Sequence, residues 1–276
     1  MIKFRRCIAN RFHMKTRYFP LLAILVVWVG EVLPTVRMEA QTASTPAGGL
    51  PLAKNEPTVD RLATTEGDVI VHPINHASLV LEWKGKAIYV DPVGGAARYQ
   101  SLPRADLILL THAHRDHLDP ATLTAVKGAN AKILAPSIVS EDLPANLQSL
   151  TSTLTNGAAA TVAGVNVLAV PAYNLTKAFH PKGVGNGYVL TLGGKRLYIS
   201  GDTEPTPEMV ALRDIDAAFL CMNQPYTMTV DQAVSAVRAF RPKIIYPYHS
   251  SGSDLNSFKK QLETEPGIEV RLLKWY

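Results

Sequence analysis

Residues 111–119 read Thr111-His112-Ala113-His114-Arg115-Asp116-His117-Leu118-Asp119, directly after the short, mostly apolar run 106–110. Three histidines and an aspartate fall within the six positions 112–117. Because side chains alternate along a strand, His112 and His114 are expected to point the same way, while Asp116 and His117 face a second position nearby. Imidazole and carboxylate groups bind zinc, manganese and iron(II) in proteins. The stretch therefore predicts a metal site at the end of a strand.

Two more candidate ligands follow apolar runs in the same way. Asp202 comes after the expected strand 196–200, and His249 comes after the expected strand 244–248. A carboxylate can bridge two metal ions, and Gly201 lets the backbone approach the site closely. A chance histidine cluster on a surface loop would not repeat this arrangement at three strand ends. We therefore predict metal ligands at His112, His114, Asp116, His117, Asp202 and His249.

The rest of the pattern predicts sheets covered by helices in one domain. Asp119-Pro120 is a helix start, because aspartate caps the helix and proline has no N–H to leave unpaired. Clusters of strands are followed by strands that alternate with helices, and this happens twice, which predicts an α/β fold. The expected strands are 68–74, 78–83, 86–90, 106–110, 132–135, 161–170, 188–192, 196–200, 216–222, 244–248 and 268–273, and the expected helices are 120–126, 205–212, 229–240 and 255–262.

The first forty residues read as a secretory signal peptide. Basic residues up to Arg17 precede the apolar run 21–29, which is shorter than the ~18 residues that a spanning helix needs. Residues 41–64 begin with a stretch rich in Thr, Ala, Pro and Gly and are expected to be a linker, and 65–276 a single folded domain. We expect the protein to be exported, either periplasmic or secreted. Membrane contact is expected only if the leader stays uncleaved.

The folded part carries no net charge. The leader holds seven of the 28 Lys and Arg and two of the 23 Asp and Glu, so 21 of each sign remain. A neutral domain gives no sign of a nucleic-acid partner. No Gly-x-Ser-x-Gly elbow occurs, and the glycine-rich segment 183–187 lacks the lysine of a phosphate-binding loop. The composition thus favours a small-molecule substrate handled by the metal site.

On these residues the sequence resembles the metallo-β-lactamase superfamily. Residues 112–117 match its H-x-H-x-D-H signature, and Asp202 and His249 follow in the family's order. Within the superfamily, the likeness over residues 65–276 is to the metal-dependent hydrolases that include ascorbate-6-phosphate lactonase and the phosphodiesterase that cleaves N-acylphosphatidylethanolamines. The supporting segments are His76-Ala77-Ser78, Asp91-Pro92 and 225–229. The resemblance implies a four-layer αββα sandwich with metal ions at one edge of its two sheets.

The resemblance also implies a reaction. It predicts hydrolysis of an ester, lactone or phosphodiester by a metal-bound hydroxide, with one or two divalent ions, zinc first and Mn²⁺ or Fe²⁺ as alternatives. Asp116 would bind the second ion and orient the nucleophile, which makes it the predicted catalytic residue. Two other functions stay open: an iron-dependent oxidoreductase of the same fold, and a non-catalytic metal-binding protein. An antibiotic-degrading β-lactamase is disfavoured, because those members generally lack a bridging aspartate like Asp202.

One position departs from the superfamily pattern. A histidine is expected after the strand that ends near Pro171, but the aligned residue is Asn174, and His180 follows six residues later. Either His180 completes the first metal site, or Asn174 supplies a weak oxygen ligand, or the site binds metal poorly. We favour His180, because catalytic zinc takes three protein ligands. His76 is expected either near the site or buried against backbone, and Asp91 either orients a ligand or ends a turn.

Overall fold

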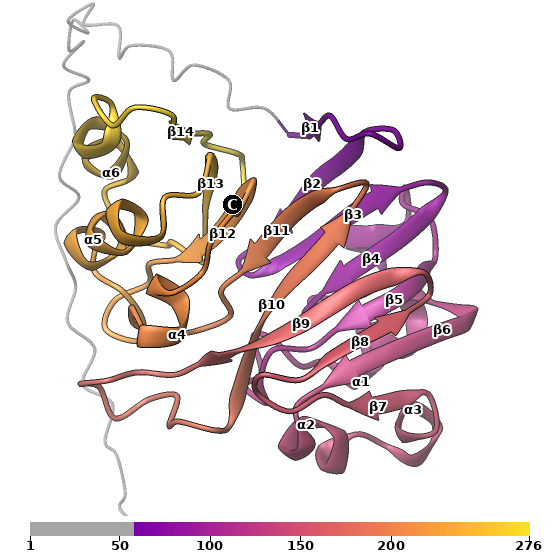
Figure 1. The fold of residues 1–276 in the computed structure, drawn as a ribbon. Coiled ribbons are helices and arrows are strands. Elements are labelled where there is room, and N and C mark those ends of the chain that lie inside the picture. Colours follow the sequence, from indigo (N-terminus) through magenta and orange to yellow (C-terminus); the bar gives the residue numbers. More distant parts are fainter. Residues whose placement is uncertain (1–57) are drawn as a thin grey trace, which may run out of the picture. The chain divides into compact units, whose positions relative to one another are not determined.

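Two mixed seven-stranded sheets make up the middle of the fold (Figure 1). The computed structural model describes residues 58–276, so the predicted signal peptide (1–40) and most of the predicted linker lie outside the described residues. In the first sheet the order is β1 (Asp60–Leu62), β2 (Val69–Asn75), β3 (Ser78–Trp83), β4 (Lys86–Val90), β5 (Ala105–Leu109), β6 (Lys127–Ala135) and β7 (Thr151–Thr153). In the second it is β14 (Glu269–Val270), β13 (Ile244–Tyr248), β12 (Ala217–Cys221), β11 (Lys195–Ile199), β10 (Gly185–Leu192), β9 (Val165–Ala172) and β8 (Ala159–Val162).

Both sheets follow one plan. The first four strands of each pair antiparallel, and the later strands join in parallel. Parallel neighbours need crossover connections, which is where the helices occur. The helical segments are η1 (Ala96–Tyr99), α1 (Pro120–Val126), α2 (Ser137–Asp142), α3 (Ala145–Gln148), α4 (Pro207–Val210), α5 (Val230–Phe240) and α6 (Leu255–Leu262). Helices α1–α3 lie on the first sheet and α4–α6 on the second, which confirms the four-layer αββα sandwich (Figure 1).

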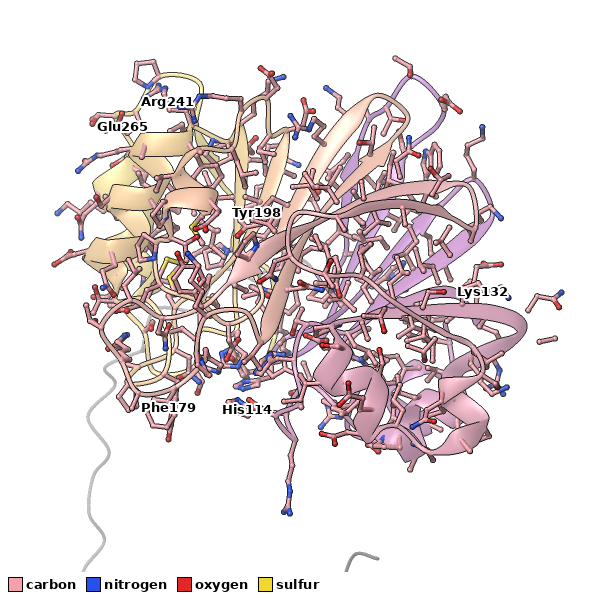
Figure 2. The ribbon with its side chains drawn as sticks, turned by 60° about the horizontal axis from the view of Figure 1, so that its bottom comes forward. His114, Lys132, Phe179, Tyr198, Arg241 and Glu265 are labelled. Atoms are coloured by element: carbon pink, nitrogen blue, oxygen red, sulfur yellow. The ribbon has the colours of Figure 1, made fainter. Side chains whose placement is uncertain are left out.

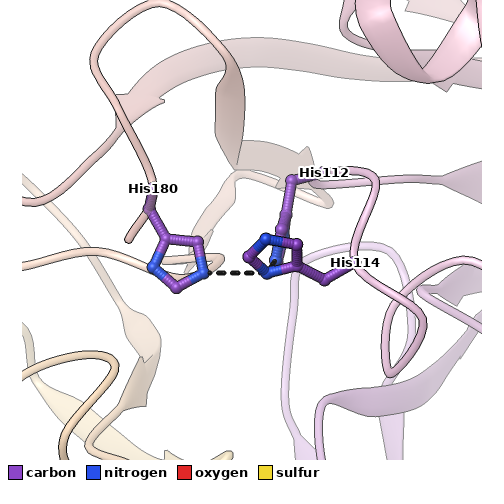
Figure 3. A group of neighbouring side chains, drawn as sticks. All are labelled: His112, His114 and His180. Carbon is purple, nitrogen blue, oxygen red and sulfur yellow. Dashed lines mark hydrogen bonds between the residues drawn. The ribbon is translucent and has the colours of Figure 1, made fainter. Parts of the chain in front are cut away.

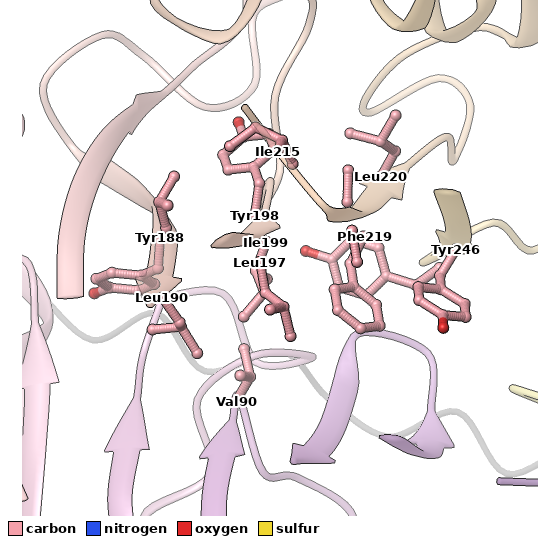
Figure 4. Packing of buried hydrophobic residues seen from close by; sticks show 14 of the residues in the cluster. Val90, Tyr188, Leu190, Leu197, Tyr198, Ile199, Ile215, Phe219, Leu220 and Tyr246 are labelled. Carbon is pink, nitrogen blue, oxygen red and sulfur yellow. The ribbon is translucent and has the colours of Figure 1, made fainter. Parts of the chain in front are cut away.

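Alternation along the strands builds the core. In β5, Leu107 and Leu109 belong to the cluster between the sheets, while Ile108 points the other way, into the cluster under α1–α3. All three side chains are fully buried, so the strand reads as a continuous apolar run. Figure 4 shows Val90 of β4 together with Leu197 of β11 in the cluster between the sheets. The sandwich therefore has apolar packing on both faces of the first sheet.

Most expected elements occur, and the differences are local. The expected strand 161–170 is in fact a hairpin, β8 and β9, because Ala163 and Gly164 adopt positive φ and turn the chain. Helices α2 and α3 and strand β7 were not expected, and β1 lies within the range 41–64 that was predicted as a linker. These elements are short and carry little apolar periodicity, so their form depends on the sheet they pack against. No helix among residues 58–276 is long and apolar enough to cross a membrane.

Hydrogen bonds join the sheets at the edge where the predicted ligands lie, and two of them involve the end of β5. The backbone N–H of Asn186 donates to the carbonyl of Thr111 at 2.9 Å, and the Tyr188 hydroxyl donates to the carbonyl of Leu110 at 2.6 Å. Gly201 has φ +61°, and a side chain there would meet the Asn186 carbonyl at 2.8 Å. Glycine is therefore required beside Asp202, because only it lets the ends of β5, β10 and β11 approach so closely.

Candidate metal centre

Three imidazole nitrogens converge at the end of β5. His114 Nδ1 lies 3.1 Å from His112 Nε2 and 3.2 Å from His180 Nε2 (Figure 3). Two ligands of a tetrahedral zinc at its usual bond lengths would be about 3.3 Å apart. The three nitrogens therefore have the spacing of a histidine zinc site. We call His112, His114 and His180 the first cluster.

A second group of side chains surrounds Asp116. Its Oδ2 lies 3.3 Å from His249 Nε2 and 3.7 Å from His117 Nε2. The Asp116 side chain is 48% exposed, whereas His117 and His249 are buried. We call Asp116, His117 and His249 the second cluster. It presents one carboxylate to solvent and two imidazoles from the interior.

Asp202 lies between the two clusters. One carboxylate oxygen, Oδ2, is 3.3 Å from His180 Nε2 and 3.6 Å from His249 Nε2. The other, Oδ1, is 3.4 Å from His117 Nε2. Asp202 is 4% exposed, so its charge faces these imidazoles rather than water. All seven predicted ligands thus come together at one edge of the sandwich, with Asp202 in the position of a bridge.

Asp91 holds the loop 111–119 from inside the fold. Its Oδ1 accepts the Thr111 backbone N–H at 2.8 Å, and its Oδ2 accepts the Thr111 hydroxyl at 2.6 Å and His117 Nδ1 at 2.7 Å. His117 must carry a proton on Nδ1 to make that bond, so Nε2, which faces Asp202, is the nitrogen that can take either a second proton or a metal ion. Of the two interpretations of Asp91, the structure supports the one in which it orients a candidate ligand.

Buried polar atoms test whether this centre fits a metal ion. Neither His117 Nε2 nor Asp202 Oδ1 has a hydrogen-bond partner within residues 58–276. Burial lowers the pKa of His117, but Asp202 and Asp91 outweigh it and raise the pKa to about 9. Burial raises the pKa of Asp202, yet the surrounding imidazoles, His117 first, bring it well below its ordinary value. With no metal bound, His117 then carries a second proton on Nε2 beside the Asp202 carboxylate, and a metal ion would take the place of that proton.

Backbone strain is concentrated in the same place. Eight non-glycine residues of the described chain have positive φ, and four of them are His76, Asp91, His180 and His249. Such conformations are uncommon for residues with a Cβ and gather at functional sites. Each of these residues turns its side chain toward the centre immediately after a strand or within a loop. Backbone strain is therefore concentrated at residues whose polar side chains point toward the candidate metal centre.

His76 joins the second cluster through a chain of hydrogen bonds. The Tyr276 hydroxyl accepts the backbone N–H groups of Ser250 and Ser251 at 3.0 Å each. Its own proton is then available for His76 Nδ1, which lies 3.1 Å away. His76 Nε2 must therefore carry a proton, and it donates to Asp116 Oδ2 at 3.1 Å. His76 is close enough to Asp116 and His249 to share a metal with them. Because both of its ring nitrogens are already used in hydrogen bonds, we assign it as a donor to Asp116 instead.

The loop 173–184, between β9 and β10, carries His180. Glu204 is 1% exposed and accepts the backbone N–H groups of Leu175 and Thr176 at 2.7 Å each. Asn174 donates its amide to the Tyr226 carbonyl at 2.7 Å and lies 3.3 Å from His180 Nδ1. Asn174 thus touches the nitrogen of His180 that faces away from the first cluster. No sequence pattern indicated Glu204 or Tyr276, because their roles arise from contacts between distant segments.

Two cavities meet at the centre. The inner cavity, about 210 Å³, lies beside the first cluster and has apolar walls from Ala113, Ile138, Ala172, Pro181 and Val184. The outer cavity, about 410 Å³, lies over the second cluster and has Phe179, Tyr226 and Asn223 at its rim. His114, His180 and Asp202 line both cavities. Figure 2 shows His114 and Phe179 along the same edge of the domain.

Known proteins are similar to this chain in sequence and in fold. The beta-lactamase superfamily domain matches residues 71–249. A UPF0173 metal-dependent hydrolase of Thermococcus onnurineus is 34% identical over 205 residues, 68% of this chain and 89% of the relative. A crystal structure from Parabacteroides distasonis, of a candidate metal-dependent hydrolase, is 42% identical with a TM-score of 0.72, covering 78% of this chain and 99% of that one. Igni18, a metallo hydrolase of Ignicoccus hospitalis, is 26% identical with a TM-score of 0.64, covering 75% and 95%.

Fold, site and relatives define the class: a metal-dependent hydrolase with the metallo-β-lactamase fold. Within that class, the chain belongs to the UPF0173 metal-dependent hydrolases. The resemblance to the superfamily is thereby confirmed. The narrower likeness to ascorbate-6-phosphate lactonase and the phosphodiesterase, and the ligand role of each site residue, stay predictions.

Proposed function

We propose that this hydrolase holds two zinc ions and cleaves an ester, lactone or phosphodiester with an activated water. The observation that carries the proposal is the pair of clusters on either side of Asp202, whose buried Oδ1 lies 3.4 Å from His117 Nε2. The first cluster would hold one ion and the second cluster the other, with Asp202 between them. When bound, zinc supplies positive charge at the reacting oxygen and brings the pKa of water close to neutral.

Asp116 is the proposed catalytic residue. Burial raises its pKa, but hydrogen bonds from His249 and His76 outweigh this and hold the carboxyl ionised far below neutral pH. Its side chain is 48% exposed and lines the outer cavity, so it can reach a water there. His76 donates to Oδ2 and fixes the direction of the carboxylate. Asp116 would thus accept a hydrogen bond from the attacking water and orient it toward the substrate.

Elemental analysis combined with hydrolysis assays tests this function. We expect up to two zinc ions per chain and hydrolysis of at least one of three generic substrates: an aryl ester, a lactone and an aryl phosphodiester. Asp202→Ala should lower the metal content and reduce hydrolysis by at least about 100-fold, because it removes the charge between the clusters. Asp106→Ala, whose carboxylate accepts only the Ala87 N–H in the first sheet, serves as the control. Full metal content in Asp202→Ala would refute the bridging role.

We further propose that the protein acts outside the cytoplasm. The support is the basic lead and short apolar run of residues 1–40, followed by an electrically neutral remainder. Mass spectrometry of the protein from its native envelope should find an N-terminus between residues 36 and 46. An intact Met1 or Met14 in the membrane fraction would contradict export with cleavage.

A further inference from the structure

We propose that the substrate is an uncharged carboxylic ester, lactone or amide whose small apolar acyl group occupies the inner cavity. The inference rests on the proposed hydrolytic function: it keeps the ester and the lactone, adds the amide, which reacts at the same acyl carbon, and excludes the phosphodiester. In the reaction, a bond forms between water oxygen and the acyl carbon, and the bond from that carbon to the alcohol or amine breaks. One water proton ends on the leaving group, and the products are a carboxylic acid and an alcohol or amine, which stay joined as one hydroxy acid when the substrate is a lactone.

The walls of the inner cavity determine what it can hold. Ala113 follows β5, Ile138 lies in α2, Ala172 ends β9, and Pro181 and Val184 belong to the loop 173–184. Its polar side chains gather on the side of the candidate ligands. An apolar cavity of about 150 Å³ in another protein stays dry and binds benzene. At about 210 Å³, the inner cavity has room for a group of the size of butyl or phenyl.

Charge argues against an anionic substrate. Neither cavity has a lysine or arginine among the described residues that line it. Lys177 instead donates to the Thr227 carbonyl and lies 3.9 Å from Glu204, and Lys182 pairs with Glu208 at 3.4 Å. Proteins bind phosphate oxygens with arginine, lysine or clustered N–H groups beside the reacting atom. The metal ions would act on the reacting group itself, and Arg115, the exposed basic residue between His114 and Asp116, lines neither cavity.

The rim of the outer cavity suits an apolar leaving group. Phe179 is 42% exposed and Tyr226 43% exposed, with ring centroids 4.9 Å apart in an edge-to-face arrangement. Exposed aromatic rings that line a cavity gain contact area when an apolar group packs between them. Because His114, His180 and Asp202 border both cavities, a substrate can place its carbonyl at the centre, its acyl group inside and its leaving group at this rim.

The test measures, on zinc-loaded protein, how kcat/KM depends on the size of the acyl group and on the charge of the substrate. The substrates are the p-nitrophenyl esters of acetate, butyrate and benzoate, together with bis(p-nitrophenyl) phosphate, with metal-free protein as the blank. We expect kcat/KM to rise about 10-fold or more from acetate to butyrate or benzoate, since an added methylene in an apolar pocket changes it by about 10–200-fold. The phosphodiester should give a lower kcat/KM than every ester.

Two variants change the size of the inner cavity in opposite directions. Val184→Phe should lower the benzoate-to-acetate ratio of kcat/KM by about 10-fold, and Ile138→Ala, at a position 41% exposed, should raise it. Val59→Phe, at an exposed position outside both cavities, should leave the ratio unchanged. A phosphodiester preferred over all esters, or a ratio that neither variant moves, would overturn the inference and leave the hydrolase intact. No metal-dependent hydrolysis of any of the four substrates or of a generic lactone would instead refute the proposed function.

Discussion

Two loops supply the imidazoles of the first cluster, and they are built in different ways. The loop 111–119 presents four candidate ligands in one tight turn, which Asp91 fixes through Thr111 and His117. The loop 173–184 presents only His180, and its anchors are Glu204 and the carbonyl of Tyr226, far away in sequence. Both loops depend on tertiary contacts, which are 20 and 26 residues away for Asp91 and 28 and 29 for Glu204. Asp91 binds a candidate ligand directly, whereas Glu204 binds the backbone and side chains of the long loop but not His180. The long loop also lines both cavities, so changes in its sequence can change which substrate fits.

The largest effect is expected from removing the ligand of the long loop. His180→Ala should empty the first cluster, reduce zinc to one ion per chain and lower kcat/KM by at least about 100-fold, because two imidazoles hold zinc poorly. Elemental analysis and ester hydrolysis measure both results. Asn174→Ala is the matched control from the same loop: its side chain contacts His180 Nδ1 and the Tyr226 carbonyl but not the first cluster, so zinc should bind about 10-fold more weakly but stay.

A rescue variant sharpens that result. If the family geometry holds at position 174, His180→Ala combined with Asn174→His should recover part of the zinc content. Full zinc in the single His180→Ala variant would show that His180 is not a ligand and that Asn174 or water takes its place.

The second prediction breaks the anchor of the short loop. Asp91→Ala leaves His117 Nδ1 and the Thr111 backbone N–H without their buried acceptor. We expect a loss of about 3–5 kcal/mol in the free energy of unfolding and zinc affinity about 10–100-fold lower. Urea unfolding and competition with a chelator measure the two. Asp106→Ala, which also removes a backbone acceptor but lies away from the centre, should lower stability alone. Equal zinc affinity in both variants would mean that Asp91 is only structural.

The difference between the two loops also explains which site residues could be predicted from the sequence. Ligands in the short loop follow from spacing, because His112 to His117 adjoin one buried strand, and Asp202 and His249 follow others. The positions of β3, β4, β13 and α6 were also predicted to the residue, since their turns and caps are local. His180 had to be inferred from a missing family histidine. Glu204 and Tyr276 could not be found, because hydrogen bonds across 28 and 200 residues leave no periodic signal.

The third prediction concerns the anchor of the long loop and its dependence on pH. Burial raises the pKa of Glu204, but donors from Gln232 and Thr176 outweigh it and lower the pKa to about 2. A carboxyl with a depressed pKa stabilises the fold above its ordinary value of 4.5, and this is lost as pH falls toward 2. Glu204→Gln should therefore lose about 1–3 kcal/mol at pH 7 and progressively less below pH 4.5.

Urea unfolding between pH 7 and pH 3 measures this difference, and hydrogen exchange should show faster opening of residues 173–184 in the variant. Glu208→Gln is the control, because Glu208 contacts the same loop through Tyr173 and Lys182 but its side chain is 33% exposed. A gap between wild type and Glu204→Gln that stays constant with pH would show that the Glu204 charge does not hold the loop.

The smallest effect is expected at Tyr276, which lies behind the second cluster. Tyr276→Phe removes the hydroxyl that accepts from Ser250 and Ser251 and donates to His76 Nδ1. Stability should fall by only about 1 kcal/mol, because the freed groups reach water at a partly exposed position.

The tautomer of His76 is the sharper readout: in zinc-loaded wild-type protein, long-range ¹H–¹⁵N spectra should show the proton on Nε2, directed at Asp116. In the variant both tautomers should be populated, and hydrolysis should slow by less than about 10-fold, since Asp116 keeps its place and loses only a fixed donor. A proton on His76 Nδ1 in the wild type would reverse the chain of hydrogen bonds and make His76 a ligand rather than a partner of Asp116.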